Sequence, residues 1–130
     1  VSAKTAGFVA TALQRVVSDQ GTAPLARVEG YTVAGKTGTA QKISPRGGYL
    51  DGRYIVSFAG FLPADKPKLM GLVIVDDAPI GSSANYGGLV AAPVFSKIAS
   101  RAVRYLDLPP ESAAVMAQSG NASTITAGTH

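Results

Sequence analysis

The chain has 130 residues, which is enough for one domain or for part of one. Hydrophobic residues make up 46% of the sequence and charged residues only 15%, below the roughly 25% of typical soluble domains, which indicates a segment that buries much of its surface. The absence of cysteine excludes thiol catalysis, disulfide bonds and thiolate metal sites, and the net charge of +4 is spread along the chain, which favours a solvated, mildly basic surface over attraction to an anionic wall or membrane.

The one histidine is His130, the last residue, so the sequence does not support a Ser-His-Asp triad or a histidine metal cluster. We also expect no metal, no cofactor and no nucleic-acid partner. No apolar run approaches the ~18 residues of a membrane span, and no signal peptide opens the chain. The sequence begins at Val1 without a methionine, and we expect it to be an excised part of a longer protein.

Residues 3–18 have the pattern of an amphipathic helix. Small and apolar residues recur at helical spacing, namely Ala6, Val9, Ala12, Leu13, Val16 and Val17. Ser2 is a suitable N-cap, and Gly21 and Pro24 are expected to end the element.

Three strands are predicted next. The first begins at Tyr31, in a stretch rich in β-branched and aromatic residues. The second covers 53–62 and the third 69–77, with turn-rich connections over 44–52 and 63–68. The third strand, "LMGLVIVDD", is apolar enough to be buried on both faces.

A loop over 78–88 precedes a second predicted helix over 91–106, which Pro109 and Pro110 stop. The apolar stripe of that helix is expected to comprise Phe95, Ile98, Ala99, Ala102 and Leu106. The element order is helix, three strands and helix. Because the connections between strands are short, we expect an antiparallel meander flanked by helices, an α/β fold of the α+β type.

Residues 30–37, "GYTVAGKT", match the phosphate-binding template G-x-x-x-x-G-K-[ST]. That template needs a flexible glycine-rich turn between a strand and a helix. Here residues 31–34 prefer extended structure, and Pro45 with two glycines follows too closely for a helix to start. We interpret the match as a coincidence of spacing and assign the segment to a strand.

A strand gives Lys36-Thr37-Gly38-Thr39 a different chemistry. Alternate side chains share a face, so Thr37 and Thr39 point together. An edge strand can pair with an extended peptide through its backbone, and Gly38 removes a side chain where such a ligand would lie close. Lys36 supplies a positive charge beside that site.

The chain as a whole resembles the transpeptidase domains of class B penicillin-binding proteins, over roughly residues 1–110. The resemblance is carried by "GYTVAGKTGTAQK" (30–42), "YIVSFAGFLPADKPKL" (54–69), "LVIVDDAP" (72–79) and "NYGGLVAAPVF" (85–95). K-T-G is one of three motifs of penicillin-binding proteins and class A β-lactamases. The resemblance implies the C-terminal portion of a penicillin-binding-protein/serine β-lactamase-like domain, and residues 111–130, rich in Ala, Ser and Thr, are expected to form a disordered tail.

The other two motifs of that family are not found where the family has them. The sequence contains no S-x-x-K, and S-x-N occurs only at Ser83-Ala84-Asn85 and Ser119-Gly120-Asn121, after the K-T-G, whereas the family places it before. We interpret both as chance matches. The nucleophilic serine is therefore expected in an upstream part of the same protein.

The resemblance implies roles for the residues of the K-T-G strand. Lys36 would organise hydrogen bonds and charge in the active site, and the hydroxyls of Thr37 and Thr39 would bind the carboxylate of a D-Ala-D-Ala stem or a β-lactam. The backbone N–H of Thr39 would form half of an oxyanion hole, and Gly38 would lie against the substrate. The alternative is a solvated lysine and ordinary strand threonines.

Three further positions are weaker candidates. Gln41 and Lys42 would reach substrate at the far end of the strand. Tyr86 would line the cleft, although a structural aromatic residue before two glycines is an equal alternative. Asp76 and Asp77 do not indicate a metal site, because adjacent strand residues face opposite sides.

By resemblance, the intact protein would be a serine-type peptidoglycan D,D-transpeptidase of cell division or elongation, which penicillins inhibit. It would lie at the extracytoplasmic face of a bacterial inner membrane, anchored by an N-terminal segment outside this chain, with divisome or elongasome proteins as possible partners. Two other classes stay open: a β-lactam sensor or β-lactamase-type hydrolase on the same scaffold, and a non-catalytic wall-binding homologue.

Overall fold

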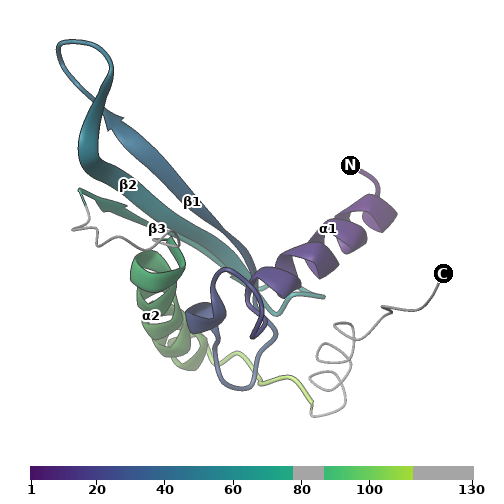
Figure 1. Cartoon of the computed structure of the whole chain (residues 1–130). Coiled ribbons are helices and arrows are strands. Elements are labelled where there is room, and N and C mark those ends of the chain that lie inside the picture. Colours follow the sequence, from purple (N-terminus) through teal and green to yellow (C-terminus); the bar gives the residue numbers. More distant parts are fainter. Residues whose placement is uncertain (78–86, 113–130) are drawn as a thin grey trace.

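The computed structural model describes residues 1–77 and 87–112, and it confirms the predicted order of helix, three strands and helix (Figure 1). The elements are α1 (Ala3–Val16), the 3₁₀ helix η1 (Pro24–Ala26), β1 (Ala34–Ile43), β2 (Tyr49–Leu62), β3 (Leu69–Asp76), the π-helical turn η2 (Gly87–Ala91) and α2 (Ala92–Tyr105). No helix in these two ranges is long and apolar enough to cross a membrane.

The sheet is an antiparallel meander in the order β1-β2-β3, as the short connections predict. The β1–β2 hairpin is longer than predicted, because β2 begins at Tyr49 and the pairing of Ile43 with Tyr49 continues the ladder past a register shift after Gln41. The turn itself is confined to 44–48, where Gly47 and Gly48 have φ values of +90° and +75° that favour glycine. The prediction of a connection over 44–52 was therefore too long.

The first strand begins at Ala34 and not at Tyr31 as predicted. Tyr31 forms only an isolated bridge with Val28. The strand then runs through Thr37 to Ile43 without turning into a helix, which confirms the strand interpretation of the K-T-G segment and contradicts the phosphate-loop template.

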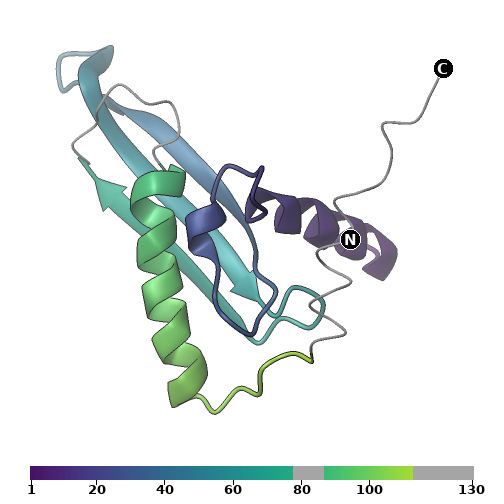
Figure 2. The same ribbon diagram turned by 60° about the horizontal axis from the view of Figure 1, so that its bottom comes forward.

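The helix α2 covers one face of the sheet, as both views show (Figures 1 and 2). Its Phe95 ring packs edge-on against Phe58 of β2, with ring centroids 5.0 Å apart. Gly60 of β2 and Gly71 of β3 make room for that ring, since a Cβ on either glycine would lie 3.0–3.1 Å from it. The most completely buried side chains of β2 belong to this face: Val56, Phe58 and Leu62.

The buried stripe of α2 differs from the predicted one. Ile98 and Leu106 are 57% and 49% exposed, whereas the stripe that faces the sheet consists of Ala92, Phe95, Ala99 and Val103. Phe95 and Ala99 belong to both stripes, whereas Leu106 lies past the end of the helix, as its C-cap.

The third strand is not buried on both faces, contrary to the prediction. Its exposure alternates along the strand, and Met70, Leu72 and Ile74 are 78%, 59% and 59% exposed. Since α2 covers only the other face, these side chains and Ile55 of β2 leave an apolar sheet face without a covering layer in the described part of the chain.

The first helix extends away from the sheet and approaches it only with its C-terminal end (Figures 1 and 2). The predicted N-cap is confirmed: the Ser2 hydroxyl accepts the N–H of Thr5 at 3.1 Å. The predicted stripe, however, is not buried within α1, and Val9 is 50% exposed. The chain turns just after the helix at Gly21, where a Cβ would lie 2.2 Å from the carbonyl oxygen of Val16.

Candidate functional site at the open edge of the sheet

The strand β1 lies at the edge of the sheet, and no strand in the described residues pairs with its outer side. The N–H of Asp77 donates to the carbonyl of Tyr54 at 3.0 Å, which extends the β2–β3 register. Hydrogen-bonded pairs alternate along antiparallel strands, so even-numbered residues of β2 bond to β3 and odd-numbered ones to β1. In this register the N–H and C=O groups of Thr37 and Thr39 point to the open edge.

Lys36 lies on the sheet face away from α2, in register with Ala59. Its side chain is exposed, and its Nζ donates to the carbonyl oxygen of Thr37 at 2.8 Å. The ammonium group therefore stands beside the outward-pointing backbone of the next residue, at the same open edge.

Thr37 and Thr39 share the opposite face, as predicted, because they pair with Phe58 and Val56 beneath α2. Thr39 is exposed and Thr37 is half-buried. The hydroxyl of Thr22, in the loop after α1, lies 3.4 Å from that of Thr37. Sequence reasoning did not identify Thr22, which lies far from the motif along the chain.

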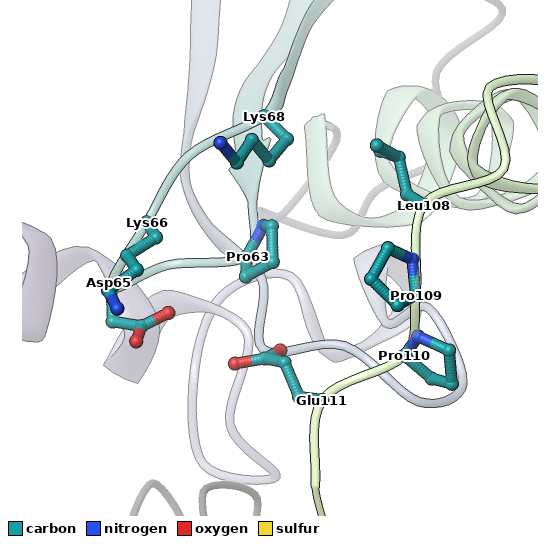
Figure 3. Close-up of a pocket in the computed structure, with 8 residues that line it drawn as sticks. All are labelled: Pro63, Asp65, Lys66, Lys68, Leu108, Pro109, Pro110 and Glu111. Carbon is teal, nitrogen blue, oxygen red and sulfur yellow. The ribbon is translucent and has the colours of Figure 1, made fainter.

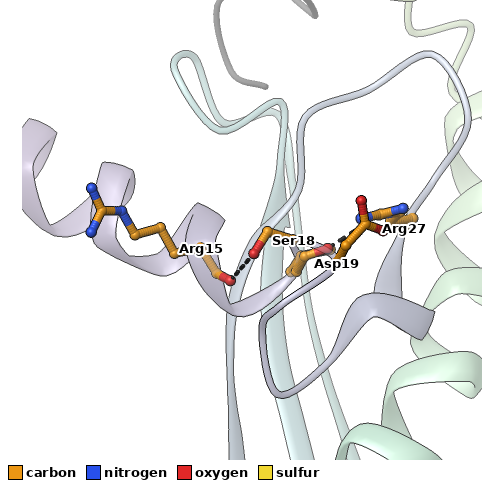
Figure 4. A network of polar contacts seen from close by, with 5 residues as sticks. Arg15, Ser18, Asp19 and Arg27 are labelled. Atoms are coloured by element: carbon orange, nitrogen blue, oxygen red, sulfur yellow. Dashed lines mark hydrogen bonds and ion pairs between the residues drawn. The ribbon is translucent and has the colours of Figure 1, made fainter. Parts of the chain in front are cut away.

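Polar contacts fix the ends of the loop that carries Thr22 (Figure 4). The Arg27 guanidinium donates to the Asp19 carboxylate at 2.6 Å and to the carbonyl of Val17 at 3.2 Å, and the Ser18 hydroxyl donates to the carbonyl of Arg15 at 2.7 Å. These contacts hold together the segment from which Thr22 reaches Thr37 of β1.

Two glycines pack at the strand. A Cβ on Gly38 would lie 2.5 Å from the Ser57 hydroxyl, which occupies the space beside this glycine. Gly87 lies over the β1–β2 ladder, where a Cβ would come within 2.6 Å of the Ser57 carbonyl oxygen and 3.1 Å of the Thr37 Cβ. In the sequence, the pair of glycines at 87–88 is the only sign of a close backbone contact at this position.

The weaker candidates make contacts within the hairpin. Gln41 donates from its side-chain amide to the carbonyl of Leu50 at 3.1 Å, and Lys42 forms an ion pair with Asp76 at 2.8 Å. Both contacts brace β1 against the rest of the sheet. Tyr86 lies outside the described residues.

The two aspartates at the end of β3 are engaged separately. Asp76 pairs with Lys42, whereas both carboxylate oxygens of Asp77 accept hydrogen bonds from the Arg53 guanidinium. The hydrogen bond from Arg53 lowers the pKa of Asp77, and the same bond raises that of Arg53. Across residues 1–77 and 87–112, no group of three or more acidic or histidine side chains could hold a metal ion.

Comparisons of the sequence with known proteins all indicate the same family. Residues 1–100 match the penicillin binding protein transpeptidase domain. Stage V sporulation protein D of Bacillus subtilis is 46% identical over 110 residues, which are 85% of this chain and 16% of that protein. The probable peptidoglycan D,D-transpeptidase PbpC of Pseudomonas aeruginosa is 47% identical over 100 residues, 76% of this chain and 17% of that protein.

A solved structure agrees with these matches. Penicillin binding protein 3 of Mycobacterium tuberculosis, complexed with ampicillin, is 38% identical and aligns with a TM-score of 0.71 over 85% of this chain and 26% of that one. The chain thus spans less than a third of each of these proteins. From the family match over residues 1–100 and the shared fold, we conclude that the chain belongs to the penicillin-binding protein transpeptidase domain family.

Proposed function

We propose that the chain is the C-terminal part of the transpeptidase domain of a peptidoglycan D,D-transpeptidase. The observation that carries this proposal is the open edge of β1, where no strand in the described structure pairs with the backbone groups of Thr37 and Thr39, and where Lys36 donates to the carbonyl of Thr37. The similarity to the probable peptidoglycan D,D-transpeptidase of Pseudomonas and to the Mycobacterium protein that was solved with ampicillin supports it.

In the proposed complex, a D-Ala-D-Ala stem or a β-lactam lies extended along the edge of β1. Its carboxylate accepts hydrogen bonds from the hydroxyls of Thr37 and Thr39, each worth roughly 1.5–3 kcal/mol because the acceptor is charged. Lys36 adds positive charge close to that carboxylate and to the reacting groups. Gly38 keeps side-chain bulk away from the ligand. Gln41 and Tyr86 are proposed as outer contacts, although the Gln41 amide is already bonded to Leu50.

The chemistry proposed is acyl transfer through a serine. A serine hydroxyl outside this chain attacks the carbonyl between the two D-alanines, the oxygen of that carbonyl becomes negative, and the N–H of Thr39 donates to it as half of an oxyanion hole. The C–N bond then breaks and D-alanine leaves with a proton. The amine of a neighbouring stem attacks the acyl-enzyme, forms the cross-link and releases the serine.

The remainder of the protein supplies what this chain lacks. We propose that an upstream segment carries the S-x-x-K serine and the S-x-N motif, and that this 130-residue chain alone is inactive. We place the protein at the extracytoplasmic face of the inner membrane, anchored by an N-terminal segment, where division or elongation proteins are its expected partners.

The test is acylation of the full-length protein by a fluorescent penicillin, with the intact mass measured before and after. We expect a mass increase of one penicillin that persists for many minutes. Rapid loss of the adduct would indicate a hydrolase instead, and the absence of any adduct would leave a non-catalytic homologue.

A further inference from the structure

The segment after α2 returns to the start of the K-T-G strand. The Glu111 carboxylate accepts both the backbone N–H and the hydroxyl of Thr32, the latter at 2.8 and 2.9 Å, although 79 residues separate the two in sequence. The N–H of Glu111 donates to the carbonyl of Gly30 at 2.9 Å, and the Tyr31 hydroxyl donates to the carbonyl of Leu108 at 2.5 Å. Residues 108–111 thus hold residues 30–32 through both backbone and side chains.

Thr32 joins a third segment to this contact. Its hydroxyl has one proton to donate, which goes to Glu111, and its oxygen accepts the N–H of Ala64 at 3.1 Å. The side chain of Thr32 therefore connects the chain before β1, the turn after β2 and the segment after α2. Thr32 is only 9% exposed, so these bonds are not readily replaced by water.

Figure 3 shows the surroundings of Glu111. It lies beside a groove of about 250 Å³ between the turn that carries Pro63 and Lys68 and the segment from Leu108 to Glu111. The prolines and Leu108 form the apolar part of the groove lining. Glu111 instead bonds directly to Thr32, which lies two residues before the start of β1.

We propose that Glu111 is a positioning residue for the K-T-G strand. This inference rests on the proposed function. No strand pairs with the outer edge of β1 in the described structure, so the positions of Lys36 and Thr37 depend on the pairing with β2, on the contacts of Thr22 and Gly87 with Thr37, and on the anchoring of the strand's start. Glu111 fixes that start through Thr32, four residues before Lys36 in the chain.

Loss of Glu111 leaves the buried N–H and hydroxyl of Thr32 without their charged acceptor. Residues 30–33 then move to find other partners, and the displacement reaches Lys36 and Thr37 through an extended backbone. Displacements of about 1 Å at reacting groups can cost on the order of a hundredfold in rate. We therefore expect Glu111→Ala to slow acylation under conditions in which the protein is still folded.

The experiment compares Glu111→Ala with Glu29→Ala in the full-length protein, since Glu29 is an exposed glutamate in the same connection before β1. Well below the melting temperature, we expect Glu111→Ala to slow acylation by penicillin about tenfold or more and Glu29→Ala to leave it within twofold. Glu111→Gln, which keeps the shape and one acceptor oxygen, should fall between them and serves if the alanine variant does not fold. Thr32→Ser, which keeps the hydroxyl, should react faster than Thr32→Val.

A second measurement does not depend on activity. Amide hydrogen exchange of peptides that cover residues 34–39 should become faster in Glu111→Ala and stay unchanged in Glu29→Ala. Acylation and exchange of Glu111→Ala that both equal the wild type would overturn the inference while leaving the proposed function intact. If the wild type itself does not react with penicillin, the proposed function fails. In that case hydrogen exchange alone tests the positioning role, and exchange of residues 34–39 that is the same in Glu111→Ala and wild type would overturn it.

Discussion

The contact between Gly87 and the K-T-G strand leads to a direct prediction. In Gly87→Ala, the added Cβ would lie 2.6 Å from the Ser57 carbonyl oxygen, 3.1 Å from the Thr37 Cβ and 3.2 Å from the Gly38 carbonyl oxygen. The first distance is shorter than any ordinary contact, and the atom concerned is backbone in the central strand. Either η2 must lift from the sheet or the β1–β2 ladder beneath it must shift.

The expected cost is that of overpacking a well-packed site, about 1–3 kcal/mol of unfolding free energy. Gly7→Ala is the matched control, because the same methyl group at the exposed middle of α1 would meet nothing within 4 Å. There the substitution should stabilise the protein by about 0.5–1 kcal/mol, since alanine is the better helix former.

Denaturant unfolding of the full-length variants measures both effects, and penicillin acylation below the unfolding transition reports on the strand. We expect Gly87→Ala to lose stability and to acylate more slowly, since Thr37 lies under the new methyl group. A Gly87→Ala protein with the stability and the acylation rate of the wild type would show that Gly87 does not pack on β1 in this way.

Two further predictions concern the strand itself. Thr39→Val keeps the shape and backbone N–H of an exposed position but removes the hydroxyl that is proposed to bind the carboxylate, so acylation of the full-length protein should slow by roughly tenfold to a hundredfold with little change in melting temperature. An unchanged rate would remove the side chain of Thr39 from the site and leave its N–H untested. Because the segment after Thr37 continues as a strand, ATP or GTP with magnesium should show no measurable binding by calorimetry, and micromolar affinity would contradict the assignment.

The K-T-G strand and the meander could be predicted because their signals are local. Short turns require antiparallel neighbours, and β-branched residues followed by Pro45 exclude a helix after Thr37. The end of the hairpin was less well predicted. Gly52, with φ of +67°, favours a turn by its local preference, yet it lies within β2, at the register shift between the pairs Gln41–Tyr54 and Ile43–Tyr49.

Burial was harder to predict, because it depends on partners distant in sequence. In the stripe of α2, Phe95 packs over Gly60 and Gly71 in two different strands. The bond between Glu111 and Thr32 joins positions 79 residues apart and has no local pattern, so the sequence alone predicts Glu111 as part of the tail. The pairing that directs Thr39 to the open edge likewise follows from the register of β2 with β3.

The uncovered face of the sheet leads to a prediction for the isolated 130-residue chain. Met70, Leu72, Ile74 and Ile55 form a contiguous apolar face, and the outer edge of β3 has unpaired backbone groups in the described structure. Such a face and edge together favour association with other chains. We expect the isolated chain to associate at micromolar concentration and to remain unlabelled by penicillin.

Two paired substitutions test the cause of this association. Leu72→Lys with Ile74→Lys places charges on the apolar face without altering the face under α2, and should shift the isolated chain towards the monomer in sedimentation experiments. Leu25→Lys, at a 49% exposed position of η1 away from β3, is the control and should not. A wild-type chain that sediments as a monomer would refute the role of the exposed face. If the double variant associates as strongly as the wild type, the free edge of β3 and not the apolar face causes the association. Stoichiometric penicillin labelling of the isolated chain, seen in its intact mass, would instead show that it already contains the nucleophile.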